Sequence, residues 1–187
     1  MTSIAAWTVG SLAGNYAYHE VMQGSAKPKI SKASCPSAVR VMIDKLKAIE
    51  KETVSLVDGC REATKTSGQL NLTPIIRLFA YENWLQSNRQ AIRAEISTAY
   101  QASISDGYLW PPTIIEDVQN GLDSLLGSLN DITCDLSGAL DKFYLTIPNH
   151  EMRQKVVEIM NQRQRLCKVD VISCKLIDAN DGNFIVR

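Results

Sequence analysis

Apolar residues recur at alternating steps of three and four positions between residues 37 and 66, which is the spacing of one face of an α-helix. Charged residues fill the positions between them, and Ser37 stands where a side-chain oxygen would cap the first turn. The pattern predicts an amphipathic helix of about eight turns. Its apolar stripe comprises Val39, Met42, Leu46, Ile49, Thr53, Leu56, Cys60 and Ala63.

A second helix is predicted from about residue 73 to residue 105. Thr73 would supply the cap oxygen, and Pro74 would occupy the first helical position, where a missing N–H costs nothing. Asp106-Gly107 would end the helix. Its core face repeats every seven residues and is widened by further apolar positions: Leu78, Leu85, Ile92 and Ala99, with Ile75, Phe79, Ile96 and Tyr100 beside them.

The most regular pattern spans residues 113–144 and predicts a third long helix. Leu126 and Leu140 broaden its stripe, and few charges flank it, so a bundle of several helices is favoured over a two-stranded coiled coil. Three glycines, Gly121, Gly127 and Gly138, either admit a close neighbouring helix or mark a break. The stripe comprises Ile115, Val118, Leu122, Leu125, Leu129, Ile132, Leu136, Ala139 and Phe143.

The pattern changes after Ile147-Pro148-Asn149, which predicts a turn. Residues 150–167 read as a shorter helix with Met152, Val156, Ile159 and Leu166 on one side. Residues 168–187 are rich in β-forming residues on both sides of Asp181-Gly182, a dipeptide typical of hairpin turns. A short C-terminal hairpin and an extended tail are equally favoured.

Together these segments predict a mainly α fold, an elongated up-and-down bundle of four to five helices with a short C-terminal β-hairpin as an option. We expect one domain over residues 1–187. It would comprise an uncharged N-terminal helix (1–23), a linker rich in Ser, Lys and Pro (24–36), the bundle helices (37–167) and a β-rich tail (168–187).

Charge divides unevenly along a chain whose 20 basic and 20 acidic residues cancel. Such neutrality excludes a general nucleic-acid binder, and the 45% hydrophobic content excludes a disordered chain. Residues 27–66 hold nine basic and five acidic residues, whereas residues 111–146 hold one basic and six acidic residues. The first and third long helices should therefore attract each other if they are neighbours, although solvated faces would give the same pattern.

Chemistry-bearing residues form no recognisable catalytic or ligand-binding motif. The two histidines, His19 and His150, lie far apart, and the five cysteines show no CxxC spacing, so we expect no metal, no cofactor and no catalytic residue. An odd number of scattered cysteines favours reduced thiols in the cytoplasm over a disulfide-bonded secreted chain.

Two sets of residues are candidates for contact with other molecules. The first is a basic set that would meet an acidic partner: Arg153, Lys155, Arg163, Arg165 and Lys168. The second lies in the uncharged first eighteen residues, where a GxxxG spacing and aromatic residues would suit a membrane or a partner helix: Trp7, Gly10, Gly14, Tyr16 and Tyr18. A solvated helix face and a buried N-terminal helix are the corresponding structural alternatives.

An uncharged, small-residue N-terminal segment ahead of amphipathic helices resembles, in layout, the membrane-permeabilising four-helix domains of fungal and plant cell-death proteins. The resemblance implies no site residue here. We expect a non-enzymatic helical-bundle protein that acts by protein–protein contact or self-association as an assembly subunit, without nucleic acid or metal. The first alternative is a membrane-active bundle of the toxin, cell-death or immunity type, associated with a membrane through its N-terminal helix. The second is an enzyme with a site assembled from scattered residues.

Overall fold

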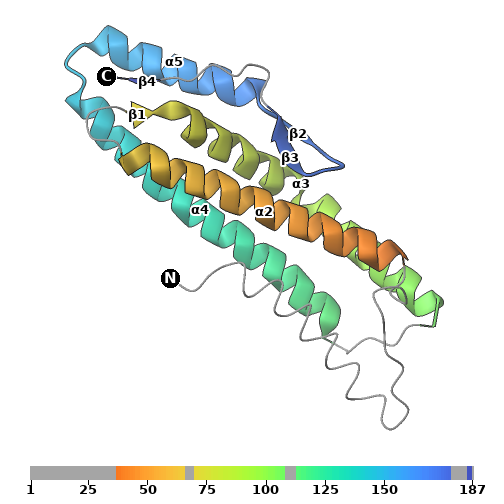
Figure 1. The fold of residues 1–187 in the computed structure, drawn as a ribbon. Coiled ribbons are helices and arrows are strands. Elements are labelled where there is room, and N and C mark those ends of the chain that lie inside the picture. The colour runs from red at the N-terminus through yellow and green to blue at the C-terminus, as the bar shows by residue number, and fades with distance from the viewer. Residues whose placement is uncertain (1–36, 66–69, 108–112, 178–184, 187) are drawn as a thin grey trace. The chain divides into compact units, whose positions relative to one another are not determined.

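The computed structural model describes residues 37–65, 70–107, 113–177 and 185–186. Within these ranges the chain forms four helices and short strands, which confirms the expected mainly α bundle with a small hairpin (Figure 1). The helices are α2 (Ser37–Lys65), α3 (Leu72–Ser105), α4 (Ile114–Thr146) and α5 (His150–Leu166). The expected N-terminal helix 1–23 and linker 24–36 lie outside the described residues.

The helix ends are set by side-chain caps, one of which the sequence analysis placed wrongly. The Asn71 Oδ1 accepts a hydrogen bond of 3.1 Å from the Thr73 N–H, so Asn71 caps α3 instead of Thr73. Pro74 is then the third helical residue, still within the first turn where an N–H lacks an intrahelical partner. As expected, Asp106-Gly107 follows the end of α3 at Ser105, and the φ of +80° at Gly107 suits a residue without a Cβ.

The described residues belong to two compact units, and α2, α3 and α4 each contribute to both. The first unit contains residues 37–47, 88–107 and 113–125. Ion pairs join its helix segments: the Lys45 Nζ lies 2.6 Å from the Glu95 Oε2, and the Arg93 NH1 lies 2.6 Å from the Asp123 Oδ2. These ion pairs join α2 to α3 and α3 to α4, and neither joins α2 to α4, so the expected attraction between the first and third long helices stays a prediction.

The second unit contains residues 48–65, 70–87, 126–177 and 185–186. Its core is built from the apolar stripes of α2 and α3 together with residues of α4, α5 and the hairpin. The α5 helix contributes little to it, because only Val156 is buried while Met152 and Leu166 are 50% and 40% exposed. Buried side chains of this unit include Ile49, Leu56, Leu72, Ile75, Leu78, Tyr81, Leu85, Leu126, Leu129 and Leu176.

The α4 helix passes through all three of its glycines without a break, but its buried face moves along its length. Leu122, Leu125 and Leu129 are buried as expected, whereas Ala139 is exposed and Leu140 is buried in its place. A strict seven-residue repeat drifts by about 20° per heptad on a straight helix. The predicted stripe therefore rotates out of the core towards the end of α4.

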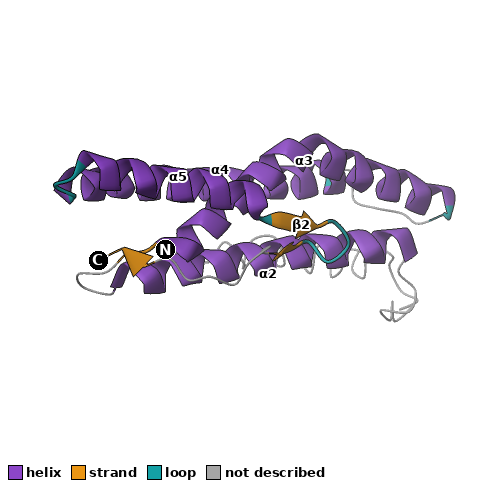
Figure 2. Cartoon of the chain, turned by 90° about the horizontal axis from the view of Figure 1, so that it is seen from above, coloured by secondary structure: helices purple, strands orange, loops and turns teal. Residues whose placement is uncertain are grey.

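The C-terminal strands (Figure 2) form a hairpin whose turn, at residues 171–174, comes before the predicted turn at Asp181-Gly182. Strand β2 (Lys168–Asp170) pairs antiparallel with β3 (Lys175–Ile177), with Val169 opposite Leu176. Strand β1 (Leu70–Asn71) instead pairs with β4 (Ile185–Val186). The hairpin is confirmed and the predicted turn is wrong, because the first β-rich run itself folds back at residues 171–174, whereas Asp181-Gly182 lies outside the described residues.

Candidate functional site

The tip of the β2–β3 hairpin is a tight turn ordered by one carboxylate. The two oxygens of Asp170 accept hydrogen bonds from the Ile172 N–H (3.2 Å), the Ser173 N–H (3.2 Å) and the Ser173 hydroxyl (2.6 Å). These bonds lower the pKa of Asp170 below its usual range, and the bond from the Ser173 side chain has the largest effect. Cys174 closes the turn with a φ of +54°, an uncommon conformation for a residue other than glycine.

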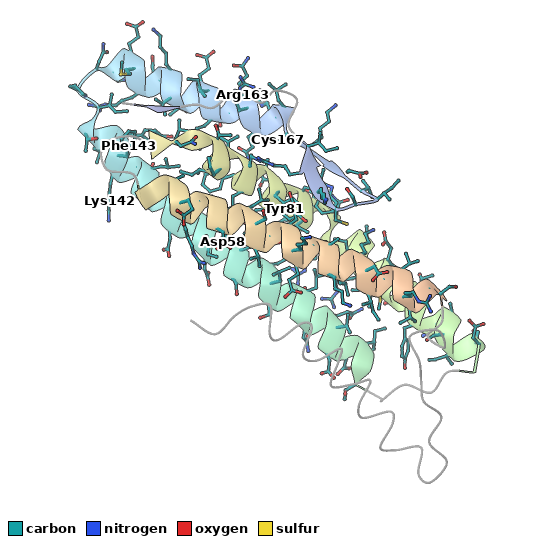
Figure 3. The ribbon with its side chains drawn as sticks, in the orientation of Figure 1. Asp58, Tyr81, Lys142, Phe143, Arg163 and Cys167 are labelled. Carbon is teal, nitrogen blue, oxygen red and sulfur yellow. The ribbon has the colours of Figure 1, made fainter. Side chains whose placement is uncertain are left out.

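Two long-range hydrogen bonds fasten this hairpin to the helices. Tyr81, which Figure 3 labels on α3, is buried, and its hydroxyl donates to the Cys174 carbonyl at 2.9 Å. The Leu176 N–H on β3 donates to the Glu52 Oε1 on α2 at 3.1 Å. Burial, followed by the neighbouring charges of Cys174 and Glu52, raises the pKa of Tyr81, so its hydroxyl stays protonated and remains a donor. The hairpin is thus held at its turn and along one strand.

Large apolar side chains project from this fastened turn into solvent. Ile172 is 92% exposed and Val171 is 58% exposed, at turn positions that polar residues and glycine usually occupy. Ile177 is 54% exposed on β3. The strand register puts the exposed Lys168 opposite Ile177 and the exposed Lys175 opposite Asp170, so both lysines lie on the same outer face as Ile177. We call Lys168, Val171, Ile172, Lys175 and Ile177 the hairpin surface.

A complementary surface lies on the part of α4 in the same unit. Its exposed residues include three carboxylates together with small side chains. Apart from the adjacent residues and the backbone of α4 itself, no described atom lies within 4 Å of the place where a Cβ on Gly127 or Gly138 would stand, so these glycines do not serve close helix packing in the described structure. We call this the α4 acidic surface; it also includes the exposed Lys142, one helical turn after Gly138, and its net charge is negative: Gly127, Asp131, Cys134, Asp135, Gly138, Ala139, Asp141 and Lys142.

The five basic residues predicted to meet an acidic partner are not gathered on one face. The Arg153 Nε donates to the Ile147 carbonyl at 2.7 Å, and the Lys155 Nζ lies 3.2 Å from the Glu151 Oε1 of its own helix. Arg163 is half-buried on α5, whereas Arg165 is exposed there and Lys168 lies on the hairpin. The structure therefore separates Lys168 from the α5 residues and associates it with Lys175.

An open groove of about 900 Å³ runs along the outer side of α5 and is lined by two members of the basic set, Arg153 and Arg165. Tyr144 of α4 closes one side, and its hydroxyl donates to the Met160 Sδ at 3.0 Å. Glu158, Val157 and polar amides complete the lining, which gives the groove a mixed character without a dominant charge.

The membrane-contact residues Trp7, Gly10, Gly14, Tyr16 and Tyr18 lie outside the described residues. Among the residues that are described, no helix is long and apolar enough to cross a membrane. No group of three or more His, Cys, Asp or Glu side chains in that part of the chain is arranged to hold a metal ion. The described cysteines, Cys60, Cys134, Cys167 and Cys174, form no disulfide with one another.

The hairpin surface was missed at the sequence level, although a signal for it exists. Asp170 and Ser173 are three residues apart, and an aspartate followed by such a spacing often caps a turn through its side chain. The turn was instead predicted at Asp181-Gly182, because an Asp-Gly dipeptide is the stronger hairpin signal. The exposure of Ile172 follows from that turn and could not be read from an apolar run alone.

No protein-family model, curated protein or solved structure matches this chain.

Proposed function

We propose that this protein is a non-enzymatic assembly subunit that self-associates by docking the hairpin surface of one copy against the α4 acidic surface of another. The observation that supports it is the nearly complete exposure of Ile172 on a turn that Asp170, Tyr81 and Glu52 hold in place. A rigid apolar projection loses little conformational entropy on binding, which is a general advantage for a docking element.

Charge complementarity between the two surfaces supports a second copy as the occupant. The hairpin surface presents Lys168 and Lys175 around its apolar tip, and the α4 acidic surface presents Asp131 and Asp135 one helical turn apart. Opposite charges that meet across an interface favour correct pairing and speed association. Because the two surfaces differ, the contact is head-to-tail and generates rings or open chains of subunits instead of a two-fold dimer.

The small residues of the α4 acidic surface leave space for the hairpin turn of another copy. A glycine within a helix costs about 1 kcal/mol relative to alanine, and Gly127 and Gly138 obtain no described packing contact within the chain in return. Small side chains let another chain approach the helix closely. The proposal thus gives these glycines an intermolecular role.

The test is the concentration dependence of mass by sedimentation velocity. Wild-type chain should gain mass as its concentration rises. Burying the Ile172 side chain in a partner would contribute about 1.5–3 kcal/mol, so Ile172→Ser should weaken the association about tenfold to a hundredfold. The matched control is Val41→Ser, which alters a β-branched residue of α2 that is 68% exposed but belongs to neither surface.

Equal weakening by both substitutions, or a wild-type chain that stays monomeric at every concentration, would contradict the proposal. A monomer that binds a different protein through Ile172 would show that the partner is not a second copy. The membrane-active and enzymatic alternatives stay predictions. The first requires that full-length chain permeabilise liposomes and that deletion of residues 1–22 abolish this activity.

A further inference from the structure

A cavity in the second unit shares only Lys175 with the hairpin surface. Its volume is about 560 Å³, within the range of small-molecule sites, and it is partly enclosed. Buried Leu56 of α2 and Leu176 of β3 form its apolar floor. The remaining lining comes from α2, from the start of α3 and from β3, and includes Ser55, Gly59, Thr73 and Pro74.

Cationic side chains predominate among the ionisable groups around this cavity. Among the described residues, Lys51 from α2, Arg77 from α3 and Lys175 from β3 line it, together with one carboxylate, that of Glu52. One oxygen of that carboxylate accepts the hydrogen bond from the Leu176 N–H. The lining therefore bears two net positive charges, drawn from three elements far apart in sequence.

We propose that this cavity binds a small phosphate monoester whose organic part rests on the apolar floor. A phosphate monoester carries about −1.5 to −2 charges at neutral pH, close to the net charge of the lining. A carboxylate or sulfonate carries one charge, which is less than the net charge of the described lining. Lysine and arginine side chains are the usual phosphate ligands, and the Ser55 hydroxyl adds a neutral donor.

The N-terminus of α3 is not the basis of this proposal. The Asn71 side chain already accepts the Thr73 N–H, so the first turn of the helix is capped within the chain. The site instead depends on the convergence of cationic groups around an apolar-floored cavity. Its occupant would touch β3 directly, because Lys175 and Leu176 both line the cavity.

Isothermal titration calorimetry with phenyl phosphate as the probe tests the assignment at constant ionic strength. An 11-atom ligand of ordinary efficiency should bind with a dissociation constant on the order of a few millimolar. Lys51→Gln removes one of three cations and should weaken binding about fivefold to tenfold. Ser55→Leu fills part of the cavity without changing its charge and should abolish measurable binding.

Lys142→Gln is the matched control, because Lys142 is an exposed lysine of α4 outside the cavity. Lys142→Gln should leave the dissociation constant unchanged within about twofold. If Lys51→Gln and Lys142→Gln weaken binding equally, the effect comes from the overall surface charge and the proposal is overturned. Phenyl sulfate, which has the same shape and one charge, should bind at least about threefold more weakly than phenyl phosphate. Equal affinity for the two probes, or no saturable binding of phenyl phosphate, would also overturn it.

Neither Lys51 nor Ser55 belongs to the hairpin surface, and Ile172 does not line the cavity. The calorimetric result and the sedimentation result therefore succeed or fail separately. Circular dichroism of the Ser55→Leu variant should match that of the wild type, which establishes that lost binding reflects a filled cavity and not a lost fold.

Discussion

Replacing Tyr81 by phenylalanine tests whether the hairpin is fastened to α3 as the structure indicates. The substitution removes one hydroxyl oxygen and keeps the ring, which stacks on Trp84 with centroids 5.7 Å apart. The lost contact is the 2.9 Å hydrogen bond to the Cys174 carbonyl, made by a tyrosine side chain that is fully buried. The perturbation is therefore confined to one polar contact between α3 and the hairpin.

The magnitude follows from that single bond. A buried hydrogen bond contributes about 0.5–1.5 kcal/mol net, and taking the donor away from a buried carbonyl adds part of its desolvation cost. We expect Tyr81→Phe to lower the free energy of unfolding by about 1.5 kcal/mol. The matched control is Tyr144→Phe, whose hydroxyl is half-buried and donates to a thioether sulfur, a weak acceptor. It should cost less than about 0.5 kcal/mol.

Urea unfolding gives the change in stability, and hydrogen exchange shows where it acts. In the Tyr81→Phe variant, amides of residues 168–177 should lose about tenfold in protection, more than amides in the middle of α3. Equal effects of the two tyrosine substitutions would refute the reasoning. A uniform loss of protection over the whole chain would also refute it, because the bond would then stabilise the fold generally without holding the hairpin.

Further predictions concern stability and thiol reactivity. Burial disfavours the charged form of Asp123, but hydrogen bonds and charge from Arg89 and Arg93 outweigh this and lower the pKa of its carboxyl group. The ionised carboxylate should therefore stabilise the fold above about pH 4, and this contribution should be lost as the pH falls through the lowered pKa. In urea titrations, Asp123→Asn should lower the free energy of unfolding by about 1 kcal/mol at pH 7 and by less at pH 3. Gly138→Ala should raise the melting temperature of the isolated chain, because it adds about 0.5–1 kcal/mol of helix stability at a position open to solvent. Burial raises the pKa of Cys60 to about 12, so mass spectrometry after iodoacetamide treatment at pH 8 should find exposed Cys134 modified and Cys60 protected until the chain unfolds.

The long helices could be predicted from the sequence because their signal extends over many turns. Every predicted long helix is present, with ends within about two residues of those expected. In α2 and α3 the predicted stripe residues Ile49, Leu78 and Leu85 are almost wholly buried. Periodicity predicts these positions well because each one repeats the same relation to the core.

The candidate site depends on local chemistry that periodicity does not report. The hairpin turn is decided by the Asp170 side chain, and its strands of three residues are too short to show an alternating pattern. The start of α3 is likewise decided by one amide, that of Asn71. The cavity could not have been found from sequence either, because it joins residues as far apart in the chain as Ala48 of α2 and Leu176 of β3.

The central claim, a head-to-tail contact between the hairpin and α4, is tested most directly by charge exchange. Lys168→Glu and Asp135→Lys should each abolish self-association in sedimentation velocity runs, because like charges then face each other. An equimolar mixture of the two variants should recover the mass of the wild type, since each hairpin meets an α4 surface of opposite charge. Recovery of mass in the mixture is the result that we predict. Two variants that stay monomeric when mixed, or that self-associate as strongly as the wild type when alone, would contradict the claim.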